Sequence, residues 1–162
     1  MTRTIPRRVC GEMEGEFVLF LIGMRLNRPW KLHRWLPVML AMPRMLQELG
    51  RQPALGLLHA RTHVGLRSAL VVQYWRSHEL LDAYATARDK AHLPAWRAFN
   101  RAIGTNGDVG IWHETYVVGA GQYESVYVNM PAFGLGRAGR LREAAGTRTT
   151  GRGRLAATTG AE

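Results

Sequence analysis

The sequence predicts an α+β protein of the ferredoxin-like class, with the element order β-α-β-β-α-β and an extra C-terminal strand. Three observations predict this class: a continuous apolar run, two strand patterns joined by a tight turn, and two segments of helical periodicity between strand patterns. Such an alternation is typical of an antiparallel sheet with both helices on one face. We expect the folded unit to lie within residues 5–133 of the 162-residue chain.

The first strand and the first helix follow from apolar spacing. Phe17–Met24 is a nearly continuous apolar run of strand length, as expected of a strand covered on both faces. Pro29 is well placed to open a helix, and Trp30–Leu49 carries apolar residues at helical spacing. Because Pro37 and Pro43 lack N–H donors, we expect two helical pieces or one kinked helix.

A hairpin and two short helices are expected next. Leu55–Val64 and Arg67–Trp75 have strand composition and are separated by a Gly-Leu pair that suits a tight turn. Ser77 is a candidate N-cap for the helix that follows. A second short helix is expected around Pro94–Ile103, with apolar residues on one side.

Two further strands complete the predicted sheet. Val109–Val118 shows alternation, and Tyr123–Met130 is the extra strand before Pro131. One face of such a sheet lacks helices and needs a cover. A second copy of the sheet is the simplest cover, so we expect a homodimer, and the extra strand Tyr123–Met130 is one that could cross to the partner.

The net charge of +10 lies mostly at the two ends of the sequence. Residues 1–8 carry +3 and residues 134–162 carry +4, whereas residues 9–133 carry +3. The segment Gly134–Glu162 holds seven of the eighteen glycines and no aromatic residue, so its composition predicts a disordered basic tail. We expect no specific nucleic-acid partner, because no basic helix face interleaved with aromatics is present between the ends.

Cysteine usage and hydropathy indicate the compartment. A lone Cys10 excludes an intramolecular disulfide and a cysteine-based zinc site. No apolar stretch approaches the roughly 18 residues that cross a bilayer, and no secretory cleavage pattern precedes the first apolar run. The sequence therefore predicts a cytoplasmic protein without a membrane span.

Polar side chains share one face of the second predicted strand. Strand alternation places His59, Arg61 and His63 on the same side. Either this side is a wet sheet edge, or it is the polar wall of a cavity that binds a substrate. Spacing leaves both interpretations open.

The strand Val109–Val118 carries a second group of candidates. His113 lies on one face, and Trp112, Glu114 and Tyr116 lie on the other. His113 suits either a core histidine bonded to a backbone carbonyl or a general base. Glu114 does not orient His113, because the two side chains point to opposite faces.

His92 lies at the break between the two helical segments that follow the hairpin, where it either caps a helix or faces the sheet cavity. The aromatic residues around it form either a pocket floor or the core between helix and sheet. These aromatic residues are Tyr74, Trp75, Tyr84 and Trp96.

Several common catalytic motifs are absent from the sequence. It contains no Gly-rich phosphate loop between a strand and a helix, no HExxH and no Gly-x-Ser-x-Gly. Cys10 has no activating histidine nearby in sequence. Nicotinamide, nucleotide-phosphate and acyl-enzyme chemistry are therefore poorly supported.

One stretch of the sequence resembles the antibiotic-biosynthesis-monooxygenase type of dimeric α+β barrel, and motifs over about four-fifths of the chain resemble one group of related proteins. The run Val72–Ala85 contains a Trp-x-Ser junction between strand and helix, and His92–Trp96 follows it. The closest resemblance is to the bacterial and fungal group related to the fumagillin-pathway polyketide monooxygenase. The segments that carry it are Phe17–Arg25, Pro29–Lys31, Met42–Met45, Gly107–Tyr116 and Tyr127–Pro131.

The resemblance implies a dimer of ferredoxin-like subunits with a cavity between sheet and helices. It implies oxidation of a hydrophobic aromatic or polyketide-like molecule by O₂, with no cofactor expected. Such chemistry needs a base and groups that hold an oxyanion. His113 and His92 are the candidate bases, and Arg61 and Tyr116 are the candidate oxyanion holders. Trp112, His59, His63 and the four aromatic residues named above are expected to contact the substrate.

Two other functions stay open at this point. Some relatives in the same superfamily bind haem through a histidine that follows the Trp-x-Ser junction, so haem with His92 as its ligand is the first alternative. A non-catalytic dimeric binding module is the second, because barrels of this shape host several functions.

Overall fold

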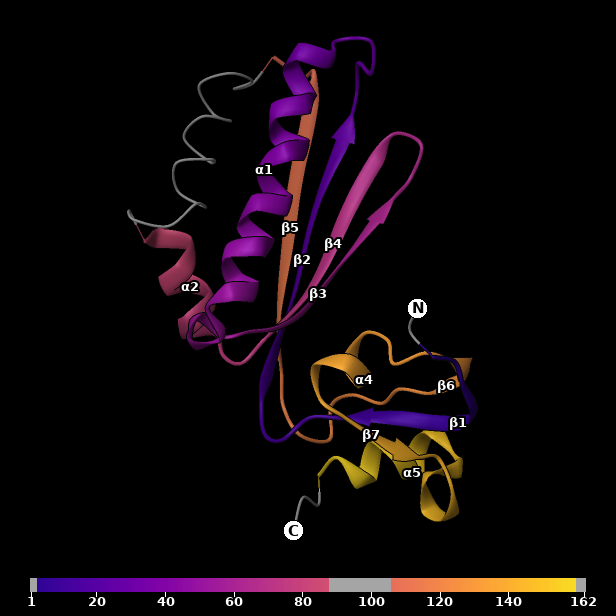
Figure 1. The fold of residues 1–162 in the computed structure, drawn as a ribbon. Coiled ribbons are helices and arrows are strands. Elements are labelled where there is room, and N and C mark those ends of the chain that lie inside the picture. Colours follow the sequence, from indigo (N-terminus) through magenta and orange to yellow (C-terminus); the bar gives the residue numbers. More distant parts are fainter. Residues whose placement is uncertain (1–2, 88–105, 160–162) are drawn as a thin grey trace.

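The computed structural model describes residues 3–87 and 106–159. Its main sheet is four-stranded and antiparallel, in the order β3-β4-β2-β5 (Figure 1). Two helices, α1 (Leu32–Arg51) and α2 (His78–Thr86), lie on one face of this sheet. The strands are β2 (Phe17–Leu26), β3 (Leu57–Val64), β4 (Ser68–Trp75) and β5 (Val109–Val118). The predicted ferredoxin-like α+β fold is therefore confirmed, although the sheet is open and does not close into a barrel.

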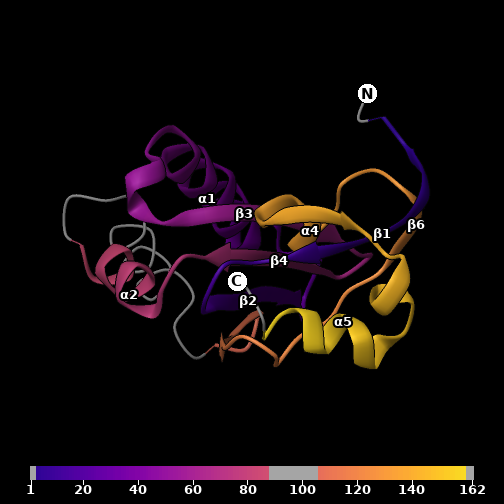
Figure 2. The ribbon, with the colours of Figure 1, turned by 90° about the horizontal axis from the view of Figure 1, so that it is seen from below.

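A second, three-stranded sheet in the order β6-β1-β7 lies beside one end of the main sheet (Figure 1), and Figure 2 views the molecule from that end. Short helices connect and flank its strands. The elements are β1 (Ile5–Glu12), β6 (Tyr127–Met130), α4 (Leu135–Ala138), β7 (Arg140–Glu143) and α5 (Gly151–Ala157). Two 3₁₀ turns, η1 (Pro53–Leu55) and η2 (Gly146–Thr149), complete the description. The sequence patterns did not predict β1 or β7.

The extra strand takes a different partner from the one expected. It begins at Tyr127, four residues later than predicted, and it pairs antiparallel with β1 of the same chain, with Val9 opposite Tyr127. The hypothesis that this strand crosses to a second copy is therefore corrected. β1 lies within reach and offers a free edge, so the backbone hydrogen bonds of the extra strand are formed within the same chain.

In place of the disordered tail that composition predicts, residues 134–159 form α4, β7, η2 and α5. The segment does not build its own core; β7 adds to the free edge of β1, with Gly11 opposite Leu141. Leu135 and Ala144 are buried there. The Arg154 side chain is 6% exposed and pairs with Glu124 at 2.7 Å. Composition wrongly predicts disorder here because it counts each arginine as a solvated charge. Arg154 is instead buried and forms a charge-assisted hydrogen bond inside the fold.

Helix α1 is one continuous helix that contains both Pro37 and Pro43. Both prolines lie exposed, so the carbonyl groups that lose a donor are near solvent. The helix begins at Leu32, after Pro29, and runs one residue beyond Gly50. The expected hairpin and the Ser77 cap are confirmed: Gly65 N–H donates to Ser68 O at 2.8 Å, and Leu80 N–H donates to the Ser77 hydroxyl.

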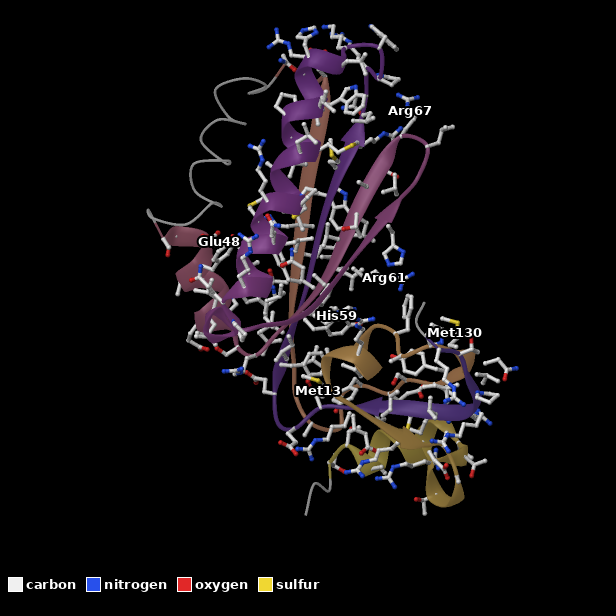
Figure 3. The ribbon with its side chains drawn as sticks, viewed as in Figure 1. Met13, Glu48, His59, Arg61, Arg67 and Met130 are labelled. Atoms are coloured by element: carbon white, nitrogen blue, oxygen red, sulfur yellow. The ribbon has the colours of Figure 1, made fainter. Side chains whose placement is uncertain are left out.

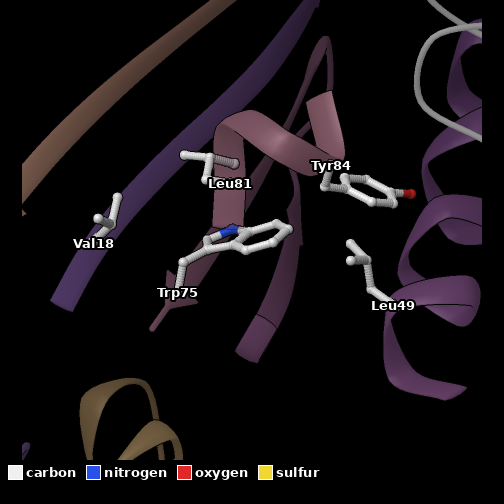
Figure 4. Close-up of a cluster of buried hydrophobic side chains, with 5 residues drawn as sticks. All are labelled: Val18, Leu49, Trp75, Leu81 and Tyr84. Atoms are coloured by element: carbon white, nitrogen blue, oxygen red, sulfur yellow. The ribbon is translucent and has the colours of Figure 1, made fainter. Parts of the chain in front are cut away.

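Two apolar clusters hold the helices against the main sheet. The first contains Val18, Leu49, Trp75, Leu81 and Tyr84, drawn from β2, α1, β4 and α2 (Figure 4). The second lies at the other end of the sheet, where Met24, Leu26 and Val109 pack against Trp35, Val38 and Met39 of α1. These clusters fix the helix-covered face, and the alternate residues of the same strands form the opposite face.

No helix in the described part of the chain combines the length and the apolar character needed to cross a membrane. The predicted helix Pro94–Ile103, with His92 and Trp96, lies outside the described residues.

Candidate active site

Strand register decides which predicted site residues share a face. On the face opposite the helices, called here the open face, paired residues form rows that run across the sheet from β3 to β5. The first row is His59, Tyr74, Leu19 and Tyr116; the second is Arg61, Val72, Leu21 and Glu114; the third is His63, Leu70, Gly23 and Trp112. The open face thus has a basic edge at β3, an apolar middle and an aromatic, acidic edge at β5.

The basic edge is where predicted site residues come together. The His59 ring stacks against Tyr74, with ring centroids 6.4 Å apart and planes at 19°. The Arg61 guanidinium lies over the Phe133 ring, 4.3 Å from its centroid, and His63 meets the same ring edge-on at 6.3 Å. Figure 3 shows His59 and Arg61 beside the second sheet. We call His59, Arg61, His63, Tyr74 and Phe133 the β3 cluster.

Electrostatics differ within the β3 cluster. His59 is half-buried, and burial lowers its pKa below the usual histidine value, with the positive charges of Arg137 and Arg61 acting in the same direction. At neutral pH its imidazole is therefore mostly uncharged and able to accept a proton. Burial and the nearby Tyr127 raise the pKa of Tyr74, which keeps its hydroxyl protonated.

The β5 edge of the open face presents an aromatic platform. The Trp112 indole lies flat over Gly23, where an added Cβ would sit 2.5 Å from the ring. Tyr116 donates a hydrogen bond to the Glu114 carboxylate at 2.7 Å. This bond raises the pKa of Tyr116. Both aromatic side chains are more than one-third exposed, so the platform is accessible.

His113 lies on the helix-covered face, apart from the other candidates. Its ring is 5.7 Å from that of Phe20, and its side chain is exposed, so it is not the buried core histidine of the first interpretation. Within the described residues, the structure gives it no carboxylate partner. His113 and the pair Arg61 and Tyr116 are thus separated by the thickness of the sheet.

Arg61 and Tyr116 also lie apart from each other. They occupy opposite edge strands, β3 and β5, with β4 and β2 between them. Strands are spaced about 4.8 Å apart, which separates these two backbones by about 14 Å. One chain therefore does not bring both predicted oxyanion holders to the same substrate oxygen.

Two predicted substrate contacts belong to the core instead. Trp75 is 1% exposed and donates from Nε1 to Gln73 Oε1 at 2.8 Å, and Tyr84 is 5% exposed and donates to Glu48 at 2.9 Å. Burial and the Glu48 carboxylate raise the pKa of Tyr84. Trp75 and Tyr84 therefore belong to the core between helix and sheet, which is the second of the two roles that the sequence left open for them.

Two residues of the open face were missed by sequence reasoning. Phe133 ends the predicted domain and was not connected to Arg61, because nothing local in sequence places it over β3. Gly23 was counted as part of an apolar run; its lack of a side chain beside Trp112 is visible only from the register.

A hollow of about 360 Å³ lies between the two sheets. Charged residues among its lining are Glu12, Glu14, Glu16, Arg76 and Arg140, and they lie among apolar ones such as Met13 and Leu58. None of the predicted site residues lines it. In the described part of the chain, no group of histidine, cysteine and acidic residues has the arrangement of a metal site.

The fold defines a ferredoxin-like α+β protein, and sequence comparison gives its family. The model of the family described as Monooxygenase af470-like matches residues 17–135. The chain belongs to this family, in agreement with the resemblance of its motifs. A relative, Monooxygenase af470 of Aspergillus fumigatus, is 31% identical over 136 residues, which cover 76% of this chain and 46% of the relative. The chain thus spans about half the length of that relative.

Solved structures with similar folds share little sequence with the chain. SnoaB, a cofactor-independent oxygenase from Streptomyces nogalater, is 13% identical, with a TM-score of 0.45 over 62% of this chain and 91% of that one. A structure described as antibiotic biosynthesis monooxygenase is 12% identical, with a TM-score of 0.42 over 59% of this chain and 95% of that one.

Proposed function

We propose that this chain is a monooxygenase that oxidises a hydrophobic, enolisable aromatic or polyketide-like molecule with O₂ and without a cofactor. One observation carries the choice of site: a half-buried histidine with a lowered pKa, His59, lies two residues from an exposed guanidinium, Arg61, on the same face of β3. A base beside a cation is the pairing that enolate formation needs.

The proposed reaction divides between these two side chains. Neutral His59 accepts a proton from a substrate CH₂ group that is made acidic by its conjugation with a carbonyl group, and Arg61 holds the enolate oxygen that develops. The carbanion passes electrons to O₂, and a hydroperoxide forms at the same carbon. Loss of water then converts the original CH₂ group to C=O, so that one oxygen atom enters the product and the other leaves as water.

The apolar middle of the open face is the proposed binding surface for the substrate. Leu21, Leu70 and Val72 are half-buried and adjoin the β3 cluster through the paired rows. The Trp112 platform lies at the far edge. An apolar floor with a few polar groups at one side is typical of small-molecule sites.

A homodimer is part of the proposal because the open face needs a cover. A two-fold axis parallel to the strands sets β3 of one copy over β5 of the other. The Arg61 edge then faces the Glu114 edge of the second copy, and the Tyr116 hydroxyl approaches the β3 cluster from across the interface. The cytoplasmic location stays a prediction.

His113 is the second candidate base, on the helix-covered face beside Phe20. We rank it below His59, because no described carboxylate orients it and Arg61 lies on the other face. The haem alternative depends on His92, outside the described residues, and is not proposed.

The test measures O₂ consumption with anthrone, an enolisable aromatic ketone, as the probe. We expect His59→Gln to lower kcat by about a hundredfold, as for loss of a general base. His78→Gln, an exposed histidine at the start of α2 and outside the proposed site, is the matched control and is expected to stay within about twofold, as is His113→Gln. Turnover lost in His113→Gln but kept in His59→Gln would move the site to the helix-covered face.

The pH profile gives a second measurement. Because the pKa of His59 is lowered, the neutral form persists below the ordinary histidine value of about 6.5. We expect activity to rise with pH to a plateau, with its midpoint under that value. A midpoint well above it would contradict His59 as the base. A wild type that consumes no O₂ with anthrone or other enolisable aromatic ketones would contradict the proposed activity.

A further inference from the structure

The end of the main sheet farthest from the second sheet is formed by two loops tied together (Figure 1). The Arg67 guanidinium, in the turn between β3 and β4, donates to Leu26 O at 3.0 Å and to Asn27 O at 2.9 Å. Leu26 N–H donates to Arg67 O at 2.8 Å. The turn 65–67 and the loop 27–31 before α1 therefore form one unit, called here the distal tip; Figure 3 labels Arg67 there.

The distal tip exposes large apolar side chains from both loops. Leu66 is 99% exposed, Val64 76%, Trp30 72% and Leu32 57%. Single exposed apolar residues are common, but here Trp30 and Leu66 of the two loops are flanked by Leu32 at the start of α1 and Val64 at the end of β3. Four large apolar side chains at one end of the sheet make a patch that indicates an interaction surface. These side chains do not pack on each other into a core; they project from the end of the molecule.

Positive charge surrounds the exposed apolar residues. Residues 17–78 contain nine Lys and Arg residues and a single acidic residue, Glu48, which lies near the other end of α1. Five of these basic residues lie at or beside the distal tip: Arg25, Arg28, Lys31, Arg34 and Arg67. Although residues 9–133 are nearly balanced in charge, the basic residues are thus concentrated in residues 17–78 and the acidic residues lie almost entirely outside that range.

One described carboxylate opposes this charge at the distal tip. Asp108 is 2% exposed and bonds to Arg28 at 2.9 Å and to Lys31 at 3.0 Å. These bonds lower the pKa of Asp108, with the Lys31 bond as the largest cause. Arg34 Nε also lies 4.0 Å from the Asp108 carboxylate. Among the described residues of the tip, this one buried carboxylate therefore serves several basic side chains and holds Arg28 and Lys31 in place.

We propose that the distal tip docks on the surface of an anionic lipid bilayer. Trp30 and Leu66 enter the headgroup region, while Arg28, Lys31 and Arg67 remain at the level of the lipid phosphates. This division follows the usual pattern of interfacial binding, with apolar insertion supported by basic side chains. The inference is independent of the proposed monooxygenase activity.

The apolar residues distinguish a bilayer from a nucleic acid. A phosphate backbone is bound by basic side chains, with aromatic rings that stack on bases. Leu66 and Val64 offer neither a charge nor a stacking ring, and they are the most exposed large apolar side chains of the tip. A hydrocarbon boundary accommodates such side chains.

The test is co-sedimentation of the full chain with vesicles of phosphatidylcholine containing about a third phosphatidylserine, compared with pure phosphatidylcholine. We expect binding to the anionic vesicles that weakens in high salt. Leu66→Asp is expected to weaken it by about tenfold, because it removes insertion and adds repulsion. Leu155→Asp makes the same chemical change on α5, at 39% exposure, and is expected to bind like wild type.

Other outcomes would overturn the proposal. Equal losses in both variants, or no binding of wild type to anionic vesicles, would contradict docking through the distal tip. Binding of a single-stranded oligonucleotide that Leu66→Asp leaves unchanged, without vesicle binding, would assign the tip to nucleic acid instead. Leu66 projects into solvent, so its substitution leaves folding intact, which a matched thermal melt checks.

Discussion

The two faces of the main sheet are made of the same strands and differ in what covers them. On the helix-covered face, Trp75 and Val18 are sealed by α1 and α2. On the open face, Trp112 and Tyr116 are accessible, and Leu21 and Val72 are half-buried. The alternation of strand side chains separates a stabilising surface from an available one over the thickness of a single sheet.

This difference teaches where the predicted residues belong. Aromatic side chains between the helices and the sheet form the core, as Trp75 of β4 and Tyr84 of α2 do. On the open face, Phe17 is buried against Tyr123 near the second sheet, whereas the exposed aromatic residues Trp112 and Tyr116 belong to neither of the two apolar clusters. The role of a tryptophan in this chain therefore depends on the face of the sheet to which it points, and its neighbours in the sequence are a poorer guide.

The largest expected effect compares the two tryptophans directly. Trp75→Ala leaves a cavity in the first apolar cluster and is expected to lower the free energy of unfolding by about 3–5 kcal/mol. Trp112→Ala on the open face is expected to cost less than about 1 kcal/mol. Urea denaturation at one low protein concentration measures both. Similar costs for the two variants would remove the distinction between the faces.

The next effect tests whether a second copy covers the open face. Leu21→Asp places a carboxylate in the apolar middle of that face, and an unpaired charge buried at an interface is strongly unfavourable. We expect dimer dissociation to become easier by about a hundredfold, or about 2.7 kcal/mol, measured by sedimentation.

The matched control for the dimer is Val128→Asp on β6, where the side chain is 54% exposed on the second sheet. It is expected to sediment as wild type does. A wild-type chain that is monomeric at micromolar concentration, or a Leu21→Asp variant that dimerises normally, would show that the open face has no second copy on it.

The smallest effect concerns the Trp112 platform. In Gly23→Ala the new methyl group meets the indole of Trp112, which must swing away. We expect a loss of about 1 kcal/mol in the free energy of unfolding. In a Trp112→Ala background the same change is expected to be neutral or stabilising, because alanine restricts the unfolded chain more than glycine does. An unchanged penalty in that background would place the clash elsewhere.

Local signals were enough to predict most of the main sheet. The bounds of β5 match the predicted Val109–Val118, and the Ser77 cap starts α2 as expected. The short strands β1 and β7 have no such signal: β1 contains Pro6 and Gly11, and β7 carries three charged residues out of four. These strands are specified by their pairing with each other, which a local pattern does not contain.

The candidate site was predictable only in part, for a related reason. Alternation correctly put His59, Arg61 and His63 on one face of β3. It also contained the information that His113 and Tyr116 face opposite ways, which separates the base expected from the sequence from one of the expected oxyanion holders. The order of strands across the sheet, which separates Arg61 from Tyr116, and the arrival of Phe133 over Arg61 depend on distant pairing.

The position of β1 between β6 and β7 has a consequence for synthesis. Among the described strands, β1 leaves the ribosome first, and both of its neighbours come more than a hundred residues later; Gly11 N–H, for example, donates to Ser125, 114 residues away. The main sheet is able to form as soon as β5 has emerged, while β1 waits with both edges unpaired. Contacts so distant in sequence form slowly. During that interval β1 is the segment most open to chaperones, proteases or the strand of a neighbouring chain.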